Sequence, residues 1–394
     1  MNTFNISRIP RILFGPGTVR QLPELAARYG KQALLVTGRN AIRDSLIWTE
    51  LISGLETLGM TWLDVKVETE PSPHLVDETV ARFKDYTIDV VIGIGGGSAL
   101  DAAKAIAGLL RSGNSVMDHL EGVGPELPYS GPTTPFIAVP TTAGTGSEAT
   151  KNAVLSLHGA QGFKKSFRDE RLIAEYAVVD PDLLVSCPPA VIAANGMDAL
   201  TQLLESLVST KANSFTDALA LDGLRITCDS LLIWYQQGAA AADARSGMAY
   251  AALLSGITLA QVGLGSVHGL AAPLGAFFPI PHGVACGTLV AAATRINIQA
   301  LLKRDPNSIA LRKYAQVGKL LSRDDTLDDL AAHAALLDVL NEWTAAMHLP
   351  RLNHYGIHAN DLPRIVANSR GSSMKTNPVV LTDEEIETVL RMRL

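Results

Sequence analysis

The feature that most constrains the fold is a long segment without formal charge. No Asp, Glu, Lys or Arg occurs from Ser246 to Thr294, although charged residues make up 18% of the chain. Such a segment is either a membrane span or the interior of a large core. Glycine and proline interrupt it too often for a lipid-exposed helix, so we predict buried core and no membrane span. The interruptions are Gly247, Gly256, Gly263, Gly265, Pro273, Pro279 and Pro281.

Length and charge narrow the class of protein. The chain has 394 residues, and domains average roughly 100 to 200 residues, so we expect two domains. The net charge of -6, with scattered Lys and Arg, offers no surface for nucleic acid. The N-terminus lacks the pattern of an export signal. The cysteines fit no disulfide or zinc spacing, and we expect each to be a small buried hydrophobe in a cytoplasmic protein. They are Cys187, Cys228 and Cys286.

Up to residue 185, short β-rich runs alternate with helical runs. The predicted strands are Gln32–Gly38, Thr61–Val67, Ile88–Gly97, Pro135–Pro140 and Tyr176–Asp180. The predicted helices are Val19–Arg28, Ile42–Leu58, Leu75–Lys84 and Ser98–Leu110. This alternation predicts an α/β domain over residues 1–185, with a parallel sheet and ligand sites at the carboxyl ends of its strands.

Over residues 186–394, Ala and Leu dominate and alternating strands vanish. The predicted helices are Ala190–Thr210, Phe215–Gln236, Gly247–Ala260, Leu330–Met347 and Asp383–Leu394. We therefore predict an all-α C-terminal domain.

A glycine-rich turn follows the strand predicted at Ile88–Gly97. Its glycines allow a tight turn and the close approach of a phosphate, and N–H groups at the start of the next helix can donate to it. They are Gly95, Gly96 and Gly97. The turn does not match GxGxxG, so a plain strand-to-helix turn is the alternative. Asp101 either contacts the ligand or caps the helix together with Ser98, and Lys104 could be a solvated partner of Asp101.

A second loop, "VPTTAGTGSEATKNAV", follows the next buried strand. Its hydroxyl groups suit hydrogen bonds to a ribose or phosphate, and Gly144 and Gly146 permit the turns. The hydroxyl residues include Thr141, Thr142, Thr145 and Ser147. Two such loops at successive strand ends predict a bound dinucleotide, NAD or NADP.

One carboxylate and two imidazoles could form a metal site in the helical half. Asp198 lies in a predicted helix, where helix capping is the alternative. His268 and His282 lie in the uncharged segment, where core imidazoles bonded to the backbone are the alternative. An Asp and two His suit Fe²⁺ or Zn²⁺ and leave a position for a substrate oxygen.

Taken in order, these motifs resemble the iron-containing, or group III, alcohol dehydrogenase family. The similar segments are "RILFGPG", "GGGSALDAAKAIA", "PTTAGTGSEAT", "GMDAL", "HGLAAPLGAFFPIPHG" and "RGSSMKTNPVVLTDEEI", so the resemblance covers essentially the whole chain. It implies NAD(P)-linked oxidation of alcohols, or reduction of aldehydes and ketones, by a homodimer or larger homo-oligomer. It also implies a dinucleotide-binding domain followed by a helical metal-binding domain.

The resemblance assigns roles to particular residues. It implies that Asp198, His268 and His282 are catalytic metal ligands. It places along the cofactor Gly96, Gly97, Ser98, Thr141, Thr142 and Lys164. Lys164 matches the family's GxKxS segment as "GFKKS", and a solvated surface lysine is the alternative.

Two positions depart from the family pattern in the helical half, and a third difference follows the strand predicted at Gln32–Gly38. Gln202 stands where a histidine is common as a fourth ligand; its amide oxygen could bind the metal more weakly, or the site could have three ligands. Ala272 replaces a histidine often assigned to proton relay, so a water or a cofactor ribose hydroxyl would serve. At Gly38 and Arg39, NAD-selective relatives often carry an Asp. We therefore expect NADP to be accepted, with Arg39 pairing its phosphate or remaining an uninvolved surface residue.

Three other functions stay open. A metal-free enzyme like maleylacetate reductase tolerates altered ligands, yet Asp198 is retained here. A lyase like dehydroquinate synthase would need Lys and Arg near its polyanionic substrate, and the uncharged segment offers none. Gln202 and Ala272 also permit a catalytically degenerate nucleotide-binding protein.

Overall fold

The structure, a computed structural model, describes residues 3–159 and 161–394. The chain divides into two compact units. The α/β unit comprises residues 6–157 and 162–187. The described residues of the helical unit are 3–5, 158, 159, 161 and 188–394.

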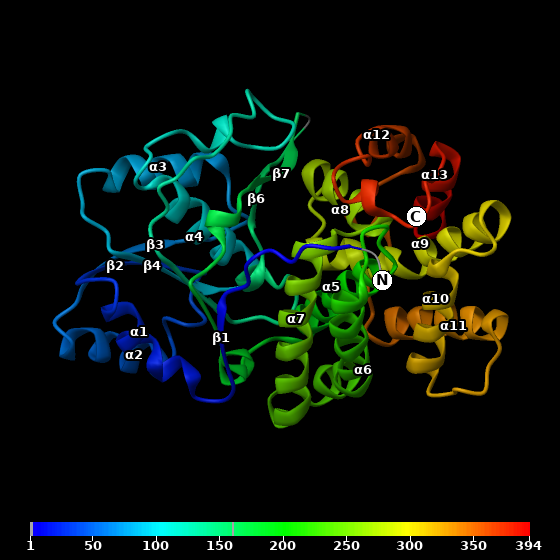
Figure 1. The fold of residues 1–394 in the computed structure, drawn as a ribbon, viewed down its shortest axis with the longest axis horizontal. Helices are drawn as coiled ribbons and strands as arrows, with labels where there is room; N and C mark the ends of the chain where they lie inside the picture. The colour runs from blue at the N-terminus through cyan, green and yellow to red at the C-terminus, as the bar shows by residue number, and fades with distance from the viewer. Residues whose placement is uncertain (1–2, 160) are drawn as a thin grey trace. The chain divides into compact units, whose positions relative to one another are not determined.

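A six-stranded parallel sheet forms the centre of the α/β unit, in the order β1-β8-β5-β4-β2-β3. The strands are β1 (Arg11–Phe14), β2 (Gln32–Thr37), β3 (Thr61–Lys66), β4 (Val90–Gly95), β5 (Phe136–Pro140) and β8 (Tyr176–Val179). The helices are α1 (Leu22–Ala27), α2 (Leu46–Thr57), α3 (Pro73–Phe83) and α4 (Gly97–Leu109). Figure 1 shows α1 and α2 on one face of the sheet and α3 and α4 on the other. The predicted fold class is confirmed.

Burial on both faces explains the apolar strands. Leu34 and Val36 of β2 pack into one core with Val76 and Val80 of α3 and Leu100 of α4. Leu35, which points to the opposite face of β2, is also fully buried. A parallel sheet covered on both faces needs continuous apolar strands, and that is the pattern the sequence shows.

The order of the strands determines which loops come together. β3 lies beside β2 at the edge of the sheet, whereas β4 lies on the inner side of β2. The connections that leave β2 and β4 therefore run in opposite directions across the sheet. Ligands of open parallel sheets bind beyond the carboxyl ends of the strands at such a point. In the pairing register Thr37 lies beside Ile94, and Gly95 lies beside Pro140.

A two-stranded antiparallel hairpin, β6 (Asn152–Leu157) and β7 (Phe163–Arg168), was not predicted. In β7 the buried Phe167 is surrounded by Lys164, Lys165 and Arg168, and these charges hide the alternation by which a strand is recognised. β1 was also missed, because it is a short, largely exposed edge strand.

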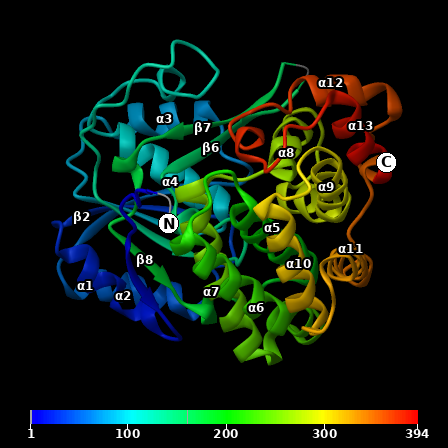
Figure 2. The same cartoon turned by 45° about the vertical axis from the view of Figure 1, so that its right-hand side comes forward.

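The helical unit is built around a buried helix, α5 (Pro189–Val208), which packs against α6, α7 and α9 (Figure 2). The other helices are α6 (Ser214–Gln237), α7 (Ala242–Val262), α8 (Ser266–Phe277), α9 (His282–Arg304), α10 (Ile309–Ser322), α11 (Asp329–Ala346), α12 (Leu362–Ala367) and α13 (Asp383–Met392). The sequence did not predict α8, α9, α10 or α12; α8 contains Pro273, a residue that usually ends helices.

The uncharged segment forms most of α7, all of α8 and the first half of α9. Among the described helices, α9 is the one long and apolar enough by itself to cross a membrane, and 89% of its apolar window is buried inside the protein. α7 and α8 meet at a bend of 100°. The segment therefore has the burial of a protein core, as predicted.

Candidate functional site

The structure brings together the three residues predicted as metal ligands. Asp198 Oδ1 lies 3.2 Å from His268 Nε2 and 3.8 Å from His282 Nε2. Asp198 is fully buried in the middle of α5, so it does not cap that helix. His268 lies in the first turn of α8, and His282 begins α9. Three helices thus direct a carboxylate and two imidazoles to one point.

Cys286 joins this group, which the sequence analysis did not foresee. Its Sγ lies 3.6 Å from His268 Nε2 and 3.8 Å from His282 Nε2. Donor atoms of Asp198, His268, His282 and Cys286, called the donor cluster below, all lie within 4.8 Å of one another. The available signal was the spacing of His282 and Cys286, because residues four apart lie on the same face of a helix.

Glu205, two helical turns after Asp198 on α5, orients His268. Its Oε2 accepts hydrogen bonds from His268 Nδ1 at 2.7 Å and from the Gly265 amide at 2.9 Å. Its Oε1 accepts from the Val267 amide at 2.7 Å. A neutral imidazole that donates from Nδ1 presents a lone pair at Nε2, the atom that faces the donor cluster. Glu205 is therefore a positioning residue that the sequence analysis missed.

The electrostatics of the donor cluster suit a cation. Burial alone raises the pKa of the Asp198 carboxyl, but His282 and His268 outweigh burial and hold that pKa below its usual value. Asp198 Oδ2 is buried and has no hydrogen-bond partner among the described residues. A buried carboxylate oxygen without a partner is costly unless a cation binds it. With two imidazoles and a sulfur beside it, the residues present fit a divalent transition metal such as Zn²⁺ or Fe²⁺.

The structure gives the surroundings of Gln202 and Ala272, the two positions that depart from the family pattern in the helical half. Gln202 is buried one turn after Asp198, and its Oε1 accepts a hydrogen bond from Ser255 Oγ of α7 at 2.7 Å. That bond engages the amide oxygen which would have to bind a metal. Ala272, on α8, presents a methyl group and cannot carry a proton. Any role of Gln202 as a ligand stays a prediction.

In the α/β unit, the loops after β2, β4 and β5 meet. A Cβ atom added at Gly97 would lie 2.8 Å from Thr145 Oγ1, and one added at Gly96 would lie 3.2 Å from Thr142 Oγ1. A Cβ at Gly95 would lie 3.3 Å from the amide nitrogen of Gly38. The backbone is thus bare where these loops touch, and no side chain caps the N-terminus of α4. This is an arrangement in which free N–H groups can bind a pyrophosphate.

Asp101 and Lys104 hold the second loop in place. Asp101 does not cap α4, which begins at Gly97; its Oδ1 accepts from Ser147 Oγ at 2.5 Å. Lys104 is fully buried rather than solvated, and burial lowers its pKa to about 8. Its Nζ donates to the Ser147 carbonyl and to Thr150 Oγ1, each at 2.8 Å. The capping interpretation is therefore wrong, and Lys104, whose Nζ lies 3.9 Å from Asp101 Oδ1, is a buried rather than a solvated partner of Asp101.

Two further residues predicted along the cofactor have protein partners. Lys164 Nζ lies 2.7 Å from Glu70 Oε1, and only 10% of the Lys164 side chain is exposed, so it is not a solvated surface lysine. Arg39 is exposed, and its Nε donates to the carbonyl of Glu68. Contact of either residue with a cofactor stays a prediction.

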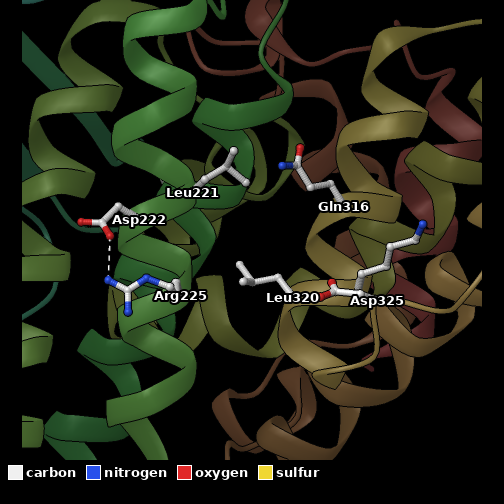
Figure 3. Close-up of a pocket in the computed structure, with 7 residues that line it drawn as sticks. Leu221, Asp222, Arg225, Gln316, Leu320 and Asp325 are labelled. Atoms are coloured by element: carbon white, nitrogen blue, oxygen red, sulfur yellow. Dashed lines mark hydrogen bonds and ion pairs between the residues drawn. The ribbon is translucent and has the colours of Figure 1, made fainter.

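A surface pocket of about 400 Å³ lies elsewhere in the helical unit, between α6 and α10 (Figure 3). It is lined by Leu221, Asp222, Arg225, Gln316, Lys319, Leu320 and Asp325. Arg225 and Asp222 pair with each other at 2.8 Å. No member of the donor cluster lines this pocket, so it is not the candidate site.

The chain matches known proteins along nearly its whole length. A family model described as "Iron-containing alcohol dehydrogenase" matches residues 10–181, and "Fe-containing alcohol dehydrogenase family, C-terminal" matches residues 192–394. Alcohol dehydrogenase 4 of Saccharomyces cerevisiae is 33% identical over 393 residues, covering 97% of this chain and 96% of the relative. Lactaldehyde reductase of Escherichia coli is 35% identical over 360 residues, covering 89% of each chain.

A solved structure, sulfoacetaldehyde reductase from Bifidobacterium kashiwanohense in complex with NAD⁺, superposes with a TM-score of 0.84 at 25% identity. The match covers 100% of this chain and 99% of that one. Together these matches support the predicted resemblance and not the three alternative functions.

Replacing Glu205 with Gln should loosen the metal centre. Gln has one acceptor oxygen and a donor amide, so at least one of the N–H groups of Gly265, Val267 and His268 loses its acceptor. We expect roughly 10- to 100-fold weaker metal binding, measured by competition with a chelator. Glu121→Gln, at a half-exposed ion pair with Arg168, is the matched control. Equal metal retention by both variants would show that Glu205 does not support the centre.

Replacing Gly97 with Val should weaken binding of a nicotinamide dinucleotide about 10-fold or more, a loss of about 1.4 kcal/mol. The new side chain would collide with Thr145 and fill the bare backbone surface. Calorimetric titration with NADH measures the loss. Gly371→Val, where an added Cβ meets no atom within 4 Å, controls for the substitution itself. Unchanged affinity in Gly97→Val would remove this turn from the cofactor site.

Proposed function

The chain belongs to the iron-containing alcohol dehydrogenase family, and from this premise we propose that it is a metal-dependent, NAD(P)-linked alcohol dehydrogenase that also reduces the matching aldehyde or ketone. The observation that carries the proposal is the donor cluster, in which Asp198 Oδ1 faces two imidazoles while its buried Oδ2 has no hydrogen-bond partner among the described residues. In this proposal residues 1–185 bind the dinucleotide and residues 186–394 hold the metal.

The residues around the donor cluster suit this reaction. When bound, a divalent cation supplies Lewis acidity to the substrate oxygen. Asp198 balances part of the positive charge, and Glu205 keeps the Nε2 lone pair of His268 directed at the centre. The His282 side chain is 26% exposed, whereas those of His268 and Asp198 are 5% and 0% exposed. We infer that the substrate reaches the cluster from the His282 side.

The surroundings of the cluster favour an uncharged substrate. The uncharged segment supplies α8 and the first half of α9, so no Lys or Arg of that segment is available for a polyanionic substrate. Low-polarity walls also strengthen the electrostatic effect of a bound cation on the substrate oxygen. Because Ala272 carries no ionisable group, it cannot accept the alcohol proton, and a water or a ribose hydroxyl of a bound cofactor would have to relay that proton to solvent.

The reaction can be tested on purified protein loaded separately with Fe²⁺ and Zn²⁺. Primary and secondary alcohols, and the matching carbonyl compounds, are assayed with NAD(H) and NADP(H). We expect Asp198→Asn to lower kcat/KM by roughly 100-fold or more, because a metal contributes several kcal/mol to catalysis. Asp222→Asn, a half-exposed residue paired with Arg225, is the control. Carbonyl reduction of equal rate by metal-free protein would favour the metal-free reductase instead.

We propose that NADP is accepted as well as NAD. An Asp at position 38 would repel a 2'-phosphate, and Gly38 has no side chain with which to do so. Arg39 follows immediately and is exposed, so its guanidinium is accessible to a phosphate. A Cβ at Gly38 would meet no atom within 4 Å, so Gly38→Asp can be made without a clash.

We therefore expect Gly38→Asp to shift the ratio of kcat/KM values for NADP and NAD toward NAD by about 10-fold or more, equivalent to about 1.4 kcal/mol. Arg39→Ala should shift it in the same direction. Initial rates with each cofactor measure the ratio, and Gly371→Asp, at another open position, is the control. If neither Gly38→Asp nor Arg39→Ala changes the ratio, the assignment of this loop to cofactor choice fails.

We further propose a cytoplasmic homodimer. None of the three cysteines forms a disulfide among the described residues, as is usual in a reducing compartment. The edge strand β1 exposes Ile12 and Phe14, and an exposed apolar edge is a common site of association between chains.

A further inference from the structure

We propose that Cys286 is the fourth protein ligand of the metal centre, and that its sulfur makes the centre prefer Zn²⁺ to Fe²⁺. This inference refines the proposed function and rests on the same donor cluster. The residue expected as a fourth ligand, Gln202, has its amide oxygen engaged by Ser255. The cluster instead contains a sulfur atom, supplied by a residue for which sequence analysis foresaw only core packing.

Four of the six separations between donor atoms are close to those of a tetrahedral site, and the other two are within 4.8 Å. Zinc binds nitrogen and oxygen at about 2.0–2.1 Å and sulfur at about 2.3 Å, which separates neighbouring donors in a tetrahedron by about 3.3–3.6 Å. The Sγ of Cys286 lies 3.6 and 3.8 Å from the Nε2 atoms of His268 and His282. Asp198 Oδ1 lies 3.2 and 3.8 Å from the same two atoms. Small adjustments would bring these four distances into that range.

The orientation of the groups points to a shared cation. His268 donates from Nδ1 to Glu205, so in the neutral ring the lone pair of Nε2 is directed at Asp198 Oδ1, itself an acceptor. Asp198 Oδ2 has no hydrogen-bond partner among the described residues. The His268 and His282 rings are tilted by 59° with centroids 5.5 Å apart, so they converge rather than stack. A cation between the four groups would bind the Nε2 lone pair of the neutral His268 ring together with the other donors of the cluster.

Cys286 lies in the donor cluster because α9 packs closely against α5. A Cβ at Gly283 would lie 2.4 Å from the carbonyl oxygen of Ala194, and one at Gly287 would lie 2.7 Å from the Cβ of Met197. These two glycines let α9 approach α5 on either side of Cys286 in sequence. Cys286 is thereby held, fully buried, in the donor cluster with Asp198.

The ligand chemistry determines the preferred metal. Carboxylate and imidazole serve both Fe²⁺ and Zn²⁺, whereas a thiolate selects the softer ion, Zn²⁺. Four protein ligands still allow catalysis, since catalytic zinc can expand to five bonds and accept a substrate oxygen. The partly exposed side of His282 provides the approach for that fifth donor.

Spectroscopy of the Co²⁺-loaded protein tests the assignment without an activity assay. We expect the wild type to show a thiolate-to-cobalt charge-transfer absorption in the near ultraviolet, and Cys286→Ala and Cys286→Ser to lack it. Cys228→Ala, which removes a thiol outside the cluster, should keep it. Chelator competition should show at least about 10-fold weaker Zn²⁺ binding by both Cys286 variants and a smaller preference for Zn²⁺ over Fe²⁺.

The outcomes separate this inference from the proposed function. Absorption in the wild type that persists in Cys286→Ser, or no such absorption in a fully loaded wild type, overturns the ligand assignment even if the enzyme is active. Absorption that depends on Cys286 in a protein without dehydrogenase activity supports the ligand assignment and contradicts the function. Circular dichroism melts of Cys286→Ser, nearly isosteric with the wild type, show whether the variant is folded.

Discussion

The geometry of the helical unit depends on the hydrogen bonds that the carboxylate of Glu205 accepts. This carboxylate lies inside α5 and accepts N–H groups from Gly265 and Val267, at the start of α8, and from the His268 ring. It therefore joins the central helix to the bend between α7 and α8 and sets the direction of His268 in one step. A buried carboxylate is tolerated only when such donors surround it, so this part of the backbone cannot move without a large cost.

Asp198 lies on the same helix, but its environment differs. Glu205 has both oxygens satisfied by N–H donors, whereas Asp198 keeps one buried oxygen without a partner among the described residues. One carboxylate thus builds the structure and the other remains available to a cation. The uncharged segment around them supplies helices that pack closely, because glycines such as Gly283 and Gly287 remove the side chains that would separate α9 from α5.

In the α/β unit, charged side chains also form hydrogen bonds that hold a loop in position. Lys104 is buried beneath the loop that follows β5, and it binds the Ser147 carbonyl and Thr150 Oγ1 while Asp101 accepts from Ser147 Oγ. These hydrogen bonds fix the conformation of the loop. The glycines of the neighbouring turn can then contact its threonines and leave the backbone bare where we propose the dinucleotide binds.

Local patterns in the sequence predicted the fold class, the strand-end loops and the two histidines of the donor cluster. Alternating strands and helices predicted the parallel sheet, glycine and hydroxyl residues marked the strand-end loops, and His268 and His282 stood out in a segment without formal charge. These signals depend on spacing over one or two turns, so they can be recognised without a fold.

Only the tertiary structure brought Cys286 and Glu205 to the candidate site. Cys286 looked like a core cysteine until α9 was packed against α5, and Glu205 looked like any helical glutamate until α8 was placed beside it. In the same way, only the packing of α7 against α5 showed that Ser255 donates a hydrogen bond to the amide oxygen of Gln202. The partners in each case are far apart along the chain, and local periodicity carries no information about contacts between distant segments.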